Sequence, residues 1–370
     1  MRHPKPIYLQ IYEDLLTSIR NQAYAPGDLL SSEKTICEQY NASRPTVAKA
    51  IKMLSDANLV QRKAGFGTQV LPPEDSGLSA GVLIPEIPDT EIFTPIIDSI
   101  IENATASDLQ ITQALNLNRP QDRQAMALTQ AEQFIKKKVK GVFFAPLENI
   151  SGAEAFNLGI VNRFTEKGIQ VVLLDRDIHP WPQQAPFDMI CIGNIEAGFT
   201  MANHLLEQGC QQLAFVSPKN PAMTVGHRVI GTREALVQNG FSARSLLSFE
   251  CELDVPEQTA MQIAKSKVDG IVCANDNTAA LMLRALLDQG VKIPQQVKVC
   301  GFEDAKYASL LSVPLTSYRQ PCDDMGRLAV ETMVNRIKHP ERPPHHIAFH
   351  GTLVMRESSA SRPEQQRDAD

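Results

Sequence analysis

Residues 32–70 contain the pattern that most constrains how this chain can fold. A short stretch with helical periodicity follows Ser32, Asn41-Ala42 interrupts it, and a second stretch follows Ser43 with Pro45 near its start. Serine is favoured at helix N-caps, and proline is tolerated in the first turn because the N–H that it lacks has no partner there. The pattern predicts two short helices joined by a tight turn, with Ser32 and Ser43 as caps.

A β-hairpin is predicted directly after the second helix. Residues 59–70 read Leu-Val-Gln-Arg-Lys-Ala-Gly-Phe-Gly-Thr-Gln-Val, with Gly65 and Gly67 near the centre. Glycine permits a narrow hairpin tip that approaches another molecule closely. Together with an amphipathic helix expected over residues 7–21, the pattern predicts a small winged helix-turn-helix domain over residues 1–71.

A winged helix-turn-helix presents the N-terminal end of its second helix to base edges and phosphates of double-stranded DNA. The candidate DNA-binding residues lie on that helix, on the helix before it and on the hairpin: Lys34, Ser43, Arg44, Thr46, Lys49, Arg62, Lys63 and Gly65. Arg44 is the expected contact to guanine, because a guanidinium can hydrogen-bond both O6 and N7 of that base. Two simpler interpretations stay open: Ser43 serves only as a cap, and the lysines are solvated.

Charge is distributed unevenly along the chain. Residues 1–71 contain nine Lys/Arg and six Asp/Glu, a net charge of +3, whereas the 370-residue chain carries −6. The remaining residues therefore carry −9. A mildly basic N-terminal domain on an acidic body favours one DNA-contacting module joined to a part that avoids DNA.

Residues 72–80 are rich in Pro, Gly and Ser and are predicted to be a linker. Short apolar runs then alternate with stretches of helical periodicity. The apolar runs are 81–84, 141–145, 169–174, 212–216, 269–273 and 297–302, and the helical stretches include 96–106, 124–138, 198–208 and 278–289. This alternation predicts an α/β body of two parallel-sheet subdomains over residues 81–358, followed by a polar, disordered tail at 359–370.

Ligands of such folds bind in the cleft beyond the carboxyl ends of the strands. The candidate ligand-binding residues are Phe93, Asp175, Arg176, Asn194, Arg228, Asp276, Asp304 and Gln320. Arg and Asp can bind adjacent hydroxyls of a polyol, and an aromatic ring can cover its apolar face. Other roles stay open: Asp276 as a helix cap, Arg228 and Asp304 in structural ion pairs, and Trp181 either on a ligand ring or packed in a Pro-rich loop.

The first 70 residues resemble the GntR-type winged helix-turn-helix. The resemblance rests on Pro6-Ile-Tyr-x-Gln-Ile, Pro26-Gly-Asp, Ser32-Glu33, Ser43-Arg44-x-Thr46-Val47, Leu54 with Leu59-Val60, and Gly65-x-Gly67-Thr68. Ala48 and Phe66 depart from the pattern, since the family commonly has arginine at both positions. Both departures remove potential contacts to phosphates or bases, so lower DNA affinity or an unusual operator is expected.

Residues 80–358 resemble the effector domain of LacI/GalR-type regulators, which is similar to type I periplasmic sugar-binding proteins. The motifs that carry it are Val171-Val-Leu-Leu-Asp-Arg176, Ile192-Gly-Asn194, Arg228-x-x-Gly231, Ala274-Asn-Asp276, Val299-Cys-Gly-Phe-Glu-Asp304, Leu315-Thr-Ser-Tyr-Arg-Gln320 and Leu353-Val-Met-Arg-Glu-Ser-Ser. The combination of the two domains resembles arabinose-repressor-type regulators. The resemblance implies a homodimer joined through the first subdomain, and it does not identify the sugar.

The function predicted is a ligand-responsive transcriptional regulator, most simply a repressor whose operator affinity a sugar-like effector changes. Activation, or a non-sugar ligand such as a purine, stays open. An enzyme is the rival class; the chain shows no Gly-rich phosphate loop after a strand and no nucleophile elbow, although an acid pair could lie in the cleft. A transport-type binding protein is disfavoured because no signal segment opens the chain and a DNA-binding domain is present.

Cysteine, histidine and hydropathy patterns bear on cofactors and location. The seven scattered cysteines include no CxxC pair, which favours free thiols in a reducing compartment, and no apolar run is long enough for a membrane span. A cytoplasmic protein without a membrane partner is expected. His345, His346 and His350 have no carboxylate or thiolate at metal-ligand spacing, so neither a metal nor another cofactor is predicted.

Overall fold

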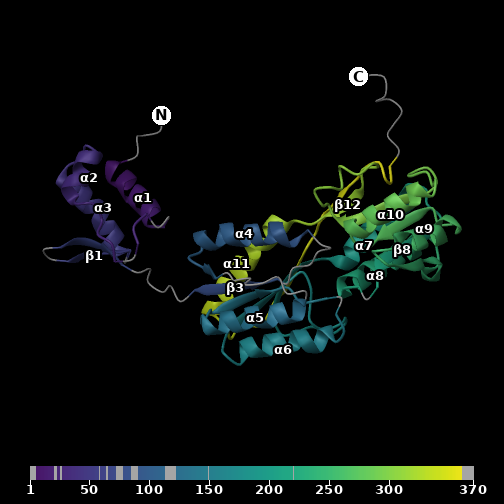
Figure 1. Cartoon of the computed structure of the whole chain (residues 1–370), viewed down its shortest axis with the longest axis horizontal. Coiled ribbons are helices and arrows are strands. Elements are labelled where there is room, and N and C mark those ends of the chain that lie inside the picture. The colour runs from purple at the N-terminus through teal and green to yellow at the C-terminus, as the bar shows by residue number, and fades with distance from the viewer. Residues whose placement is uncertain are drawn as a thin grey trace, which may run out of the picture. The chain divides into compact units, whose positions relative to one another are not determined.

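The computed structural model describes residues 6–20, 23–25, 27–57, 59–63, 66–71, 78–84, 91–112, 122–148, 150–219 and 221–360. The chain divides into two compact units, Met1–Gly77 and Leu78–Asp370 (Figure 1). Gly65, residues 72–77 of the expected linker and residues 361–370 of the expected tail lie outside the described residues.

The first unit is a winged helix-turn-helix. Its elements are α1 (Ile7–Arg20), α2 (Glu33–Gln39), α3 (Arg44–Asp56) and an antiparallel hairpin of β1 (Val60–Lys63) and β2 (Gly67–Val70). Apolar side chains of all three helices meet in one core, in which Ile11, Ile36 and Val47 are at most 1 % exposed. The predicted hairpin and helix-turn-helix are confirmed.

The two predicted helix caps differ. The Ser32 hydroxyl accepts a hydrogen bond from the Thr35 N–H at 3.1 Å, so it caps α2 as predicted. Ser43 occupies the cap position of α3, but its Oγ lies 2.8 Å from Oγ1 of Thr46 and makes no cap hydrogen bond to the backbone. The prediction for Ser43 was wrong in this respect, because the neighbouring hydroxyl satisfies it instead.

The first subdomain of the second unit is built on a six-stranded parallel sheet in the order β13-β7-β6-β5-β3-β4. These strands are His346–Phe349, Asp188–Ile192, Gln170–Leu174, Gly141–Phe144, Ser79–Leu83 and Gln110–Thr112. The helices packed on it are α4 (Phe93–Ala106), α5 (Arg123–Lys136), α6 (Ala153–Thr165) and α11 (Cys322–Lys338).

The second subdomain has a sheet in the order β14-β12-β11-β10-β8-β9, parallel except for β14. These strands are Thr352–Val354, Thr316–Arg319, Lys298–Glu303, Gly270–Cys273, Leu213–Pro218 and Leu247–Cys251. Its helices are α7 (Asn194–Glu207), α8 (Met223–Gln238), α9 (Pro256–Ala264) and α10 (Asp276–Asp288), with a 3-10 turn at Ala243–Ser245.

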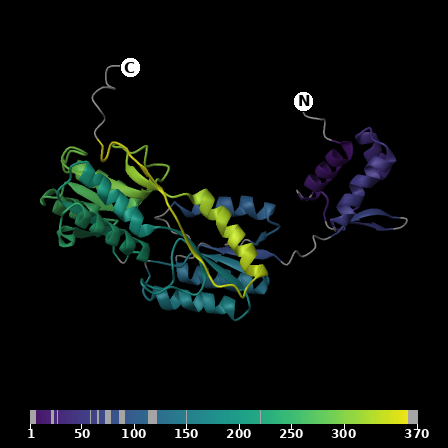
Figure 2. The same ribbon diagram turned by 180° about the vertical axis from the view of Figure 1, so that it is seen from behind.

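The chain crosses between the subdomains three times. It passes from β7 to α7 through Gly193, from β12 to α11 through Gln320 and Pro321, and from β13 to β14 through His350 and Gly351. Figure 2 shows the last of these as the yellow segment that runs along the back of both subdomains. Three connections of a few residues each are the kind of joint about which two rigid halves can close on a ligand.

Helices α7 and α8 pack with their backbones in direct contact. A Cβ added at Gly198 would meet the Arg228 carbonyl, and one added at Gly231 would meet the carbonyl of Ile195. Only glycine permits this approach, and it fixes the position of α8, which carries Arg228, against α7.

All six apolar runs predicted as strands are strands of the two sheets, which confirms the predicted fold class. Two predicted boundaries move. Ser79 and Ala80 belong to β3 rather than to the linker, and Ser359 is fully buried rather than part of a disordered tail, with its Oγ 2.7 Å from Nε2 of His204. In the described part of the chain, every helix is too short or too polar to cross a bilayer.

Candidate ligand site and nucleic-acid interface

The N-terminal end of α3 presents an unobstructed cation. Ser43 and Arg44 are exposed, Thr46 is half-buried, and the Arg44 guanidinium makes no hydrogen bond or ion pair to any residue that the structure describes. Lys34 on α2 and Lys63 at the end of β1 are likewise exposed. This surface can therefore offer cations to an anionic partner without first breaking an internal contact.

Two other predicted DNA-binding residues are already engaged. Arg62 forms an ion pair with Glu33 of α2, and the Lys49 ammonium lies 3.7 Å from the ring centroid of Tyr8. The pair of Arg62 is exposed and can exchange readily, since surface ion pairs contribute little net free energy. Phe66, at the hairpin tip, is 76 % exposed, and Gly67 beside it has φ +110°, a conformation that glycine adopts without strain.

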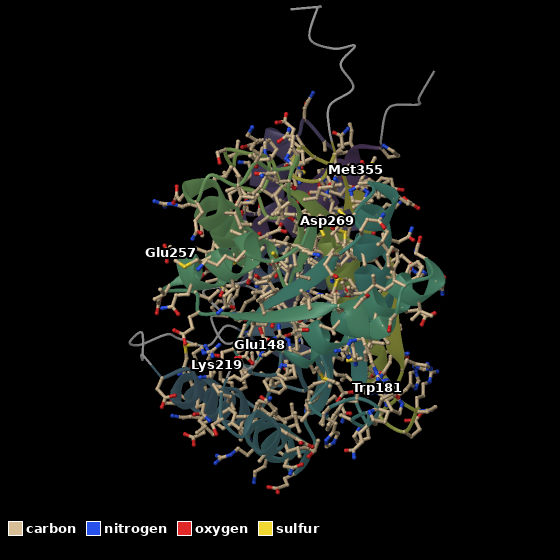
Figure 3. All side chains as sticks on the ribbon, turned by 90° about the vertical axis from the view of Figure 1, so that its right-hand side faces the viewer. Glu148, Trp181, Lys219, Glu257, Asp269 and Met355 are labelled. Atoms are coloured by element: carbon tan, nitrogen blue, oxygen red, sulfur yellow. The ribbon has the colours of Figure 1, made fainter. Side chains whose placement is uncertain are left out.

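Two adjoining cavities lie between the subdomains of the body. The smaller one, of about 40 Å³, is lined by Ile92, Glu148, Asp175, Arg176, Pro218, Ala222, Thr224, Val225, Arg228, Leu253, Ala274, Asn275, Thr278 and Glu303. The larger, of about 530 Å³, is lined by Glu91, Ile92, Thr94, Pro95, residues 303–306 and residues 319–324. They share Ile92 and Glu303, and both subdomains contribute to each. In Figure 3, Glu148 lies where the ribbons of the two subdomains meet.

Arg176 is the centre of the contribution from the first subdomain. It is 4 % exposed, its Nε and Nη2 lie 2.9 and 2.8 Å from Oδ2 of Asp175, and its Nη1 pairs with Glu148. Its guanidinium also lies over the ring of Phe93, 5.4 Å from the centroid. Burial alone lowers the pKa of Arg176, but the carboxylates of Glu148 and Asp175 outweigh it, and the net pKa is raised.

Arg228 is the corresponding residue of the second subdomain. From α8 its Nε donates to Oδ1 of Asn194 at 2.9 Å and its Nη1 to the Ala274 carbonyl at 2.6 Å, over the ring of Phe302 at 4.4 Å. Burial lowers the pKa of Arg228, and the carboxylate of Asp175 acts in the opposite direction. No ion pair of Arg228 is found among the described residues, so its role as a structural salt bridge is not supported.

Backbone strain is concentrated at this site. Asp175, Glu303 and Asp304 all have positive φ, at 68°, 110° and 52°, and each follows or ends a central strand. Non-glycine residues adopt this region at a cost of about 1–3 kcal/mol and tend to cluster at binding sites. The strained turns aim the carboxyl groups at the cleft instead of continuing the sheet.

Two predicted ligand contacts are placed differently from expectation. Asp276 is fully buried and lines neither cavity: its carboxylate accepts hydrogen bonds from the Ser317 hydroxyl at 2.6 Å and the Ala305 N–H at 2.8 Å. It is not the cap of α10 either, since Asn275 performs that role. Asp304 lines the larger cavity, but both carboxylate oxygens pair with arginine, Oδ2 with Arg319 and Oδ1 with Arg356, each at 2.6 Å.

The remaining predicted residues fall into two groups. Phe93 and Asn194 are buried beneath the arginines and support them without lining a cavity. Gln320 is 5 % exposed and lines the larger cavity, and both its Nε2 and its Oε1 lack a hydrogen-bond partner among the described residues. A buried amide in this state is expensive unless a ligand satisfies it.

Several lining residues of the smaller cavity were missed from the sequence, among them Glu148, Asn275 and Glu303. Asn275 and Glu303 immediately precede the predicted Asp276 and Asp304, so both motifs were found; Asp276 was off by one residue, whereas Asp304 lines the larger cavity beside Glu303. Glu148 lies four residues beyond β5, and its only signal was a carboxylate after a buried strand. Burial raises the pKa of Glu303 well above its ordinary value, and the nearby Asp276 raises it further. No group of three or more His, Cys, Asp or Glu that could hold a metal ion occurs in the described ranges.

Comparison with known families accounts for both units. Residues 7–70 match the gntR family of bacterial regulatory proteins, and residues 202–359 match a periplasmic-binding-protein-like domain. The chain joins a gntR-type DNA-binding domain to a periplasmic-binding-protein-like effector domain. These matches confirm the predicted domain types and the prediction of a DNA-binding regulator rather than an enzyme.

Curated relatives match almost the whole chain. An arabinose metabolism transcriptional repressor of Geobacillus stearothermophilus is 24 % identical over 90 % of this chain and 92 % of its own length. A protein of the same description from Halalkalibacterium halodurans is 23 % identical over 95 % of this chain and 96 % of its own. A ribose operon repressor of Haemophilus influenzae is 26 % identical over 48 % of this chain and 55 % of its own length.

Solved structures share the fold of the effector domain. A LacI-family regulator of Enterococcus faecium with bound ribose has a TM-score of 0.62 and 20 % identity, and covers 76 % of this chain and 98 % of its own. The cellobiose complex of the transcriptional regulator CelR has a TM-score of 0.63 and 19 % identity. It covers 89 % of this chain and 100 % of its own.

Proposed function

We propose that this protein is a transcriptional repressor whose gntR-type domain binds an operator and whose effector domain binds a small carbohydrate that changes operator affinity. The observation that carries the proposal is the presence, on one chain, of a free arginine at the start of α3 and a buried charged cluster between two sheets. The first is suited to bases and phosphates and the second to a small polar ligand.

A carbohydrate fits the residues of the ligand site. Arg228 and Gln320 offer donors, Asp175 and Glu303 offer acceptors, and the larger cavity of about 530 Å³ lies within the range of small-molecule sites. The named arabinose and ribose repressors among the relatives support the same class of effector. Activation instead of repression, or a purine effector, is the alternative that the experiments below separate.

Signalling requires that the ligand bind two conformations of the effector domain with different affinity. Each cavity is lined from both subdomains, so a ligand makes its full set of contacts only when the subdomains are closed. The three crossings at Gly193, Gln320-Pro321 and His350-Gly351 are the segments about which this closure takes place. Closure then alters the separation of two gntR-type domains in a homodimer, which a pseudo-palindromic operator senses. The cytoplasm, where operator DNA is found, is the proposed location.

A combined binding assay tests this function. Operator fragments selected from random double-stranded DNA are titrated with the full chain, in the absence and presence of ribose, arabinose, glucose and adenine. Release of the operator by one sugar supports repression, and tighter binding supports activation. A response to adenine alone moves the effector to the purine class. Gln320→Ala removes two unsatisfied polar atoms, so it should fold normally and lose the sugar response while it retains operator binding.

A further inference from the structure

We propose that the ligand site selects an uncharged polyol and rejects the phosphorylated or carboxylated form of the same sugar. The inference rests on the proposed function, because it concerns the effector of the same site. It is carried by three observations: the charge balance of the lining, the state of the two buried arginines, and the kind of polar atoms left without partners.

The described residues of both cavities include more carboxyl groups than cations. The smaller cavity has three carboxyl groups against two guanidiniums: Glu148, Asp175 and Glu303, whose pKa is raised by burial, against Arg176 and Arg228. The larger has five carboxylates against two cations: Glu91, Glu303, Asp304, Asp323 and Asp324 against Lys306 and Arg319. Like charges brought together out of water repel strongly, so an anion entering this cleft is opposed.

The arginines that line the cavities already have hydrogen-bond or ion-pair partners. Arg176 is held by Asp175 and Glu148 together, and a phosphate could bind it only by displacing one of them and leaving that carboxylate buried without its cation. Arg228 donates its Nε and Nη1 to the neutral Asn194 side chain and Ala274 carbonyl, which fix its position without neutralising its charge. The nearby carboxyl groups of Asp175, Glu303 and Glu148 oppose an anion placed beside it. Arg319 of the larger cavity is paired with Asp304.

The polar atoms of the site that lack partners are suited to bind hydroxyl groups. Oδ1 of Asp175 and Oε1 of Gln320 are buried acceptors, and Nε2 of Gln320 is a buried donor, each without a hydrogen-bond partner among the described residues. A sugar hydroxyl both donates and accepts, so it can satisfy all three atoms, whereas a phosphate dianion or a carboxylate can only accept. The site therefore has two acceptors and one donor without partners, and this combination favours an uncharged polyol over an anion.

A planar purine is disfavoured by the same residues. No aromatic side chain lines either cavity within the described residues. The nearby rings of Phe93 and Phe302 have a face covered by the guanidiniums of Arg176 and Arg228. A base in the cleft would find no free aromatic surface to stack on, whereas a puckered polyol does not require one.

The test compares each neutral sugar with an anionic derivative of the same sugar. Isothermal titration of the full chain uses ribose against ribose 5-phosphate, arabinose against arabinose 5-phosphate, and glucose against glucose 6-phosphate and glucuronate. We expect at least one neutral sugar to bind and its anionic counterpart to bind at least about 100-fold more weakly. Equal or tighter binding of the anionic member of that pair overturns the inference, and so does failure of every neutral sugar to bind.

Operator binding, measured on the same preparations, separates this inference from the proposed function. Operator release by a phosphorylated sugar would leave the function standing and overturn the charge selectivity. Binding of a neutral sugar, but not of its phosphate, without any effect on operator binding would support the charge selectivity and overturn the proposed function.

A charge-neutralising variant locates the selectivity. Glu148→Gln removes one carboxylate from the smaller cavity, and we expect the ratio of neutral to phosphorylated affinity to fall by about tenfold. Glu132→Gln is the matched control, because Glu132 is exposed on α5 and changes the net charge equally. If Glu148→Gln unfolds, Asp323→Asn, which neutralises a carboxylate that lines the larger cavity, replaces it. A folded variant with an unchanged ratio contradicts the assignment.

Discussion

The ring of Trp181 meets the ring of His227 edge-on between the two subdomains, with centroids 6.5 Å apart and planes at 87°. Trp181 belongs to the loop between β6 and β7 of the first subdomain, and His227 lies on α8 of the second. The chain has one tryptophan, and it is 60 % exposed. Of the two roles considered from the sequence, neither anticipated this contact between the subdomains.

Closure of the cleft should therefore be visible in the fluorescence of Trp181. We expect a saturating shift of its emission to shorter wavelength when a binding sugar is added, because closure removes the exposed part of the ring from water. The titration midpoint should equal the calorimetric Kd. Trp181→Phe should abolish the signal without abolishing binding, and a signal that persists in Gln320→Ala at equal sugar concentration would argue against a link to ligand.

Arg44→Ala should weaken operator binding by about 1–3 kcal/mol, with the loss concentrated on one base pair of the site. The physical reason is the loss of a two-pronged contact to guanine from the exposed start of α3. Gel-shift titrations with wild-type and singly substituted operators measure both effects. Arg284→Ala is the control of equal charge, since Arg284 is 85 % exposed on α10 of the effector domain. Equal operator affinity of Arg44→Ala and the control would remove Arg44 from the interface.

Phe66→Arg should strengthen DNA binding and steepen its salt dependence. Phe66 is 76 % exposed at the hairpin tip, so the substitution costs no packing and adds a cation beside Lys63. One additional phosphate contact changes the slope of log K against log salt by about −0.9. Titrations between low and high salt provide the measurement. An unchanged slope, with Phe66→Ala also neutral, would place the hairpin tip away from DNA.

Asp276→Asn should change how stability depends on pH. Burial raises the pKa of Asp276 from 3.8 to about 7, although hydrogen bonds from Ser317 and Ala305 oppose the rise. Because the folded-state pKa is the higher one, the associated stability is complete below pH 3.8 and is lost as the pH rises through about 7. The total is at most roughly 4 kcal/mol. Denaturant unfolding from pH 5 to 8 should show a smaller decline for Asp276→Asn; parallel curves would contradict the assignment.

The sequence located the site to within one residue at two of its strand ends. Arg176 and Arg228 were predicted and lie at the centre of the cluster, whereas Asp276 was chosen in place of Asn275, and Asp304 was predicted without its neighbour Glu303. Adjacent residues at a strand end point in opposite directions, and the positive φ of Glu303 and Asp304 turns the chain in a way that no periodicity reveals. Burial distinguishes the two neighbours. The carboxylate of Asp276 is enclosed by Ser317 and Ala305 and is structural, whereas Asn275 lines the smaller cavity.

An amphipathic stripe was enough to predict α1, and a serine cap was enough to predict α2. Glu148 illustrates the opposite case. It lies beyond the end of β5 in an irregular segment, and its pairing with Arg176 depends on the order of the strands in the sheet, which a single sequence does not state.

The glycine contact between α7 and α8 has a consequence for how this site can diverge. Because Gly198 and Gly231 set the distance between the two helix backbones, the backbone position of Arg228 depends on main-chain contact, and Asn194 and Phe302 then hold its guanidinium. Lining residues such as Thr224 or Leu253 can then be exchanged for others without moving the arginine. A new ligand preference can arise from a few substitutions while the packing of α7 against α8 stays unchanged. Replacement of either glycine would instead move the two helices apart.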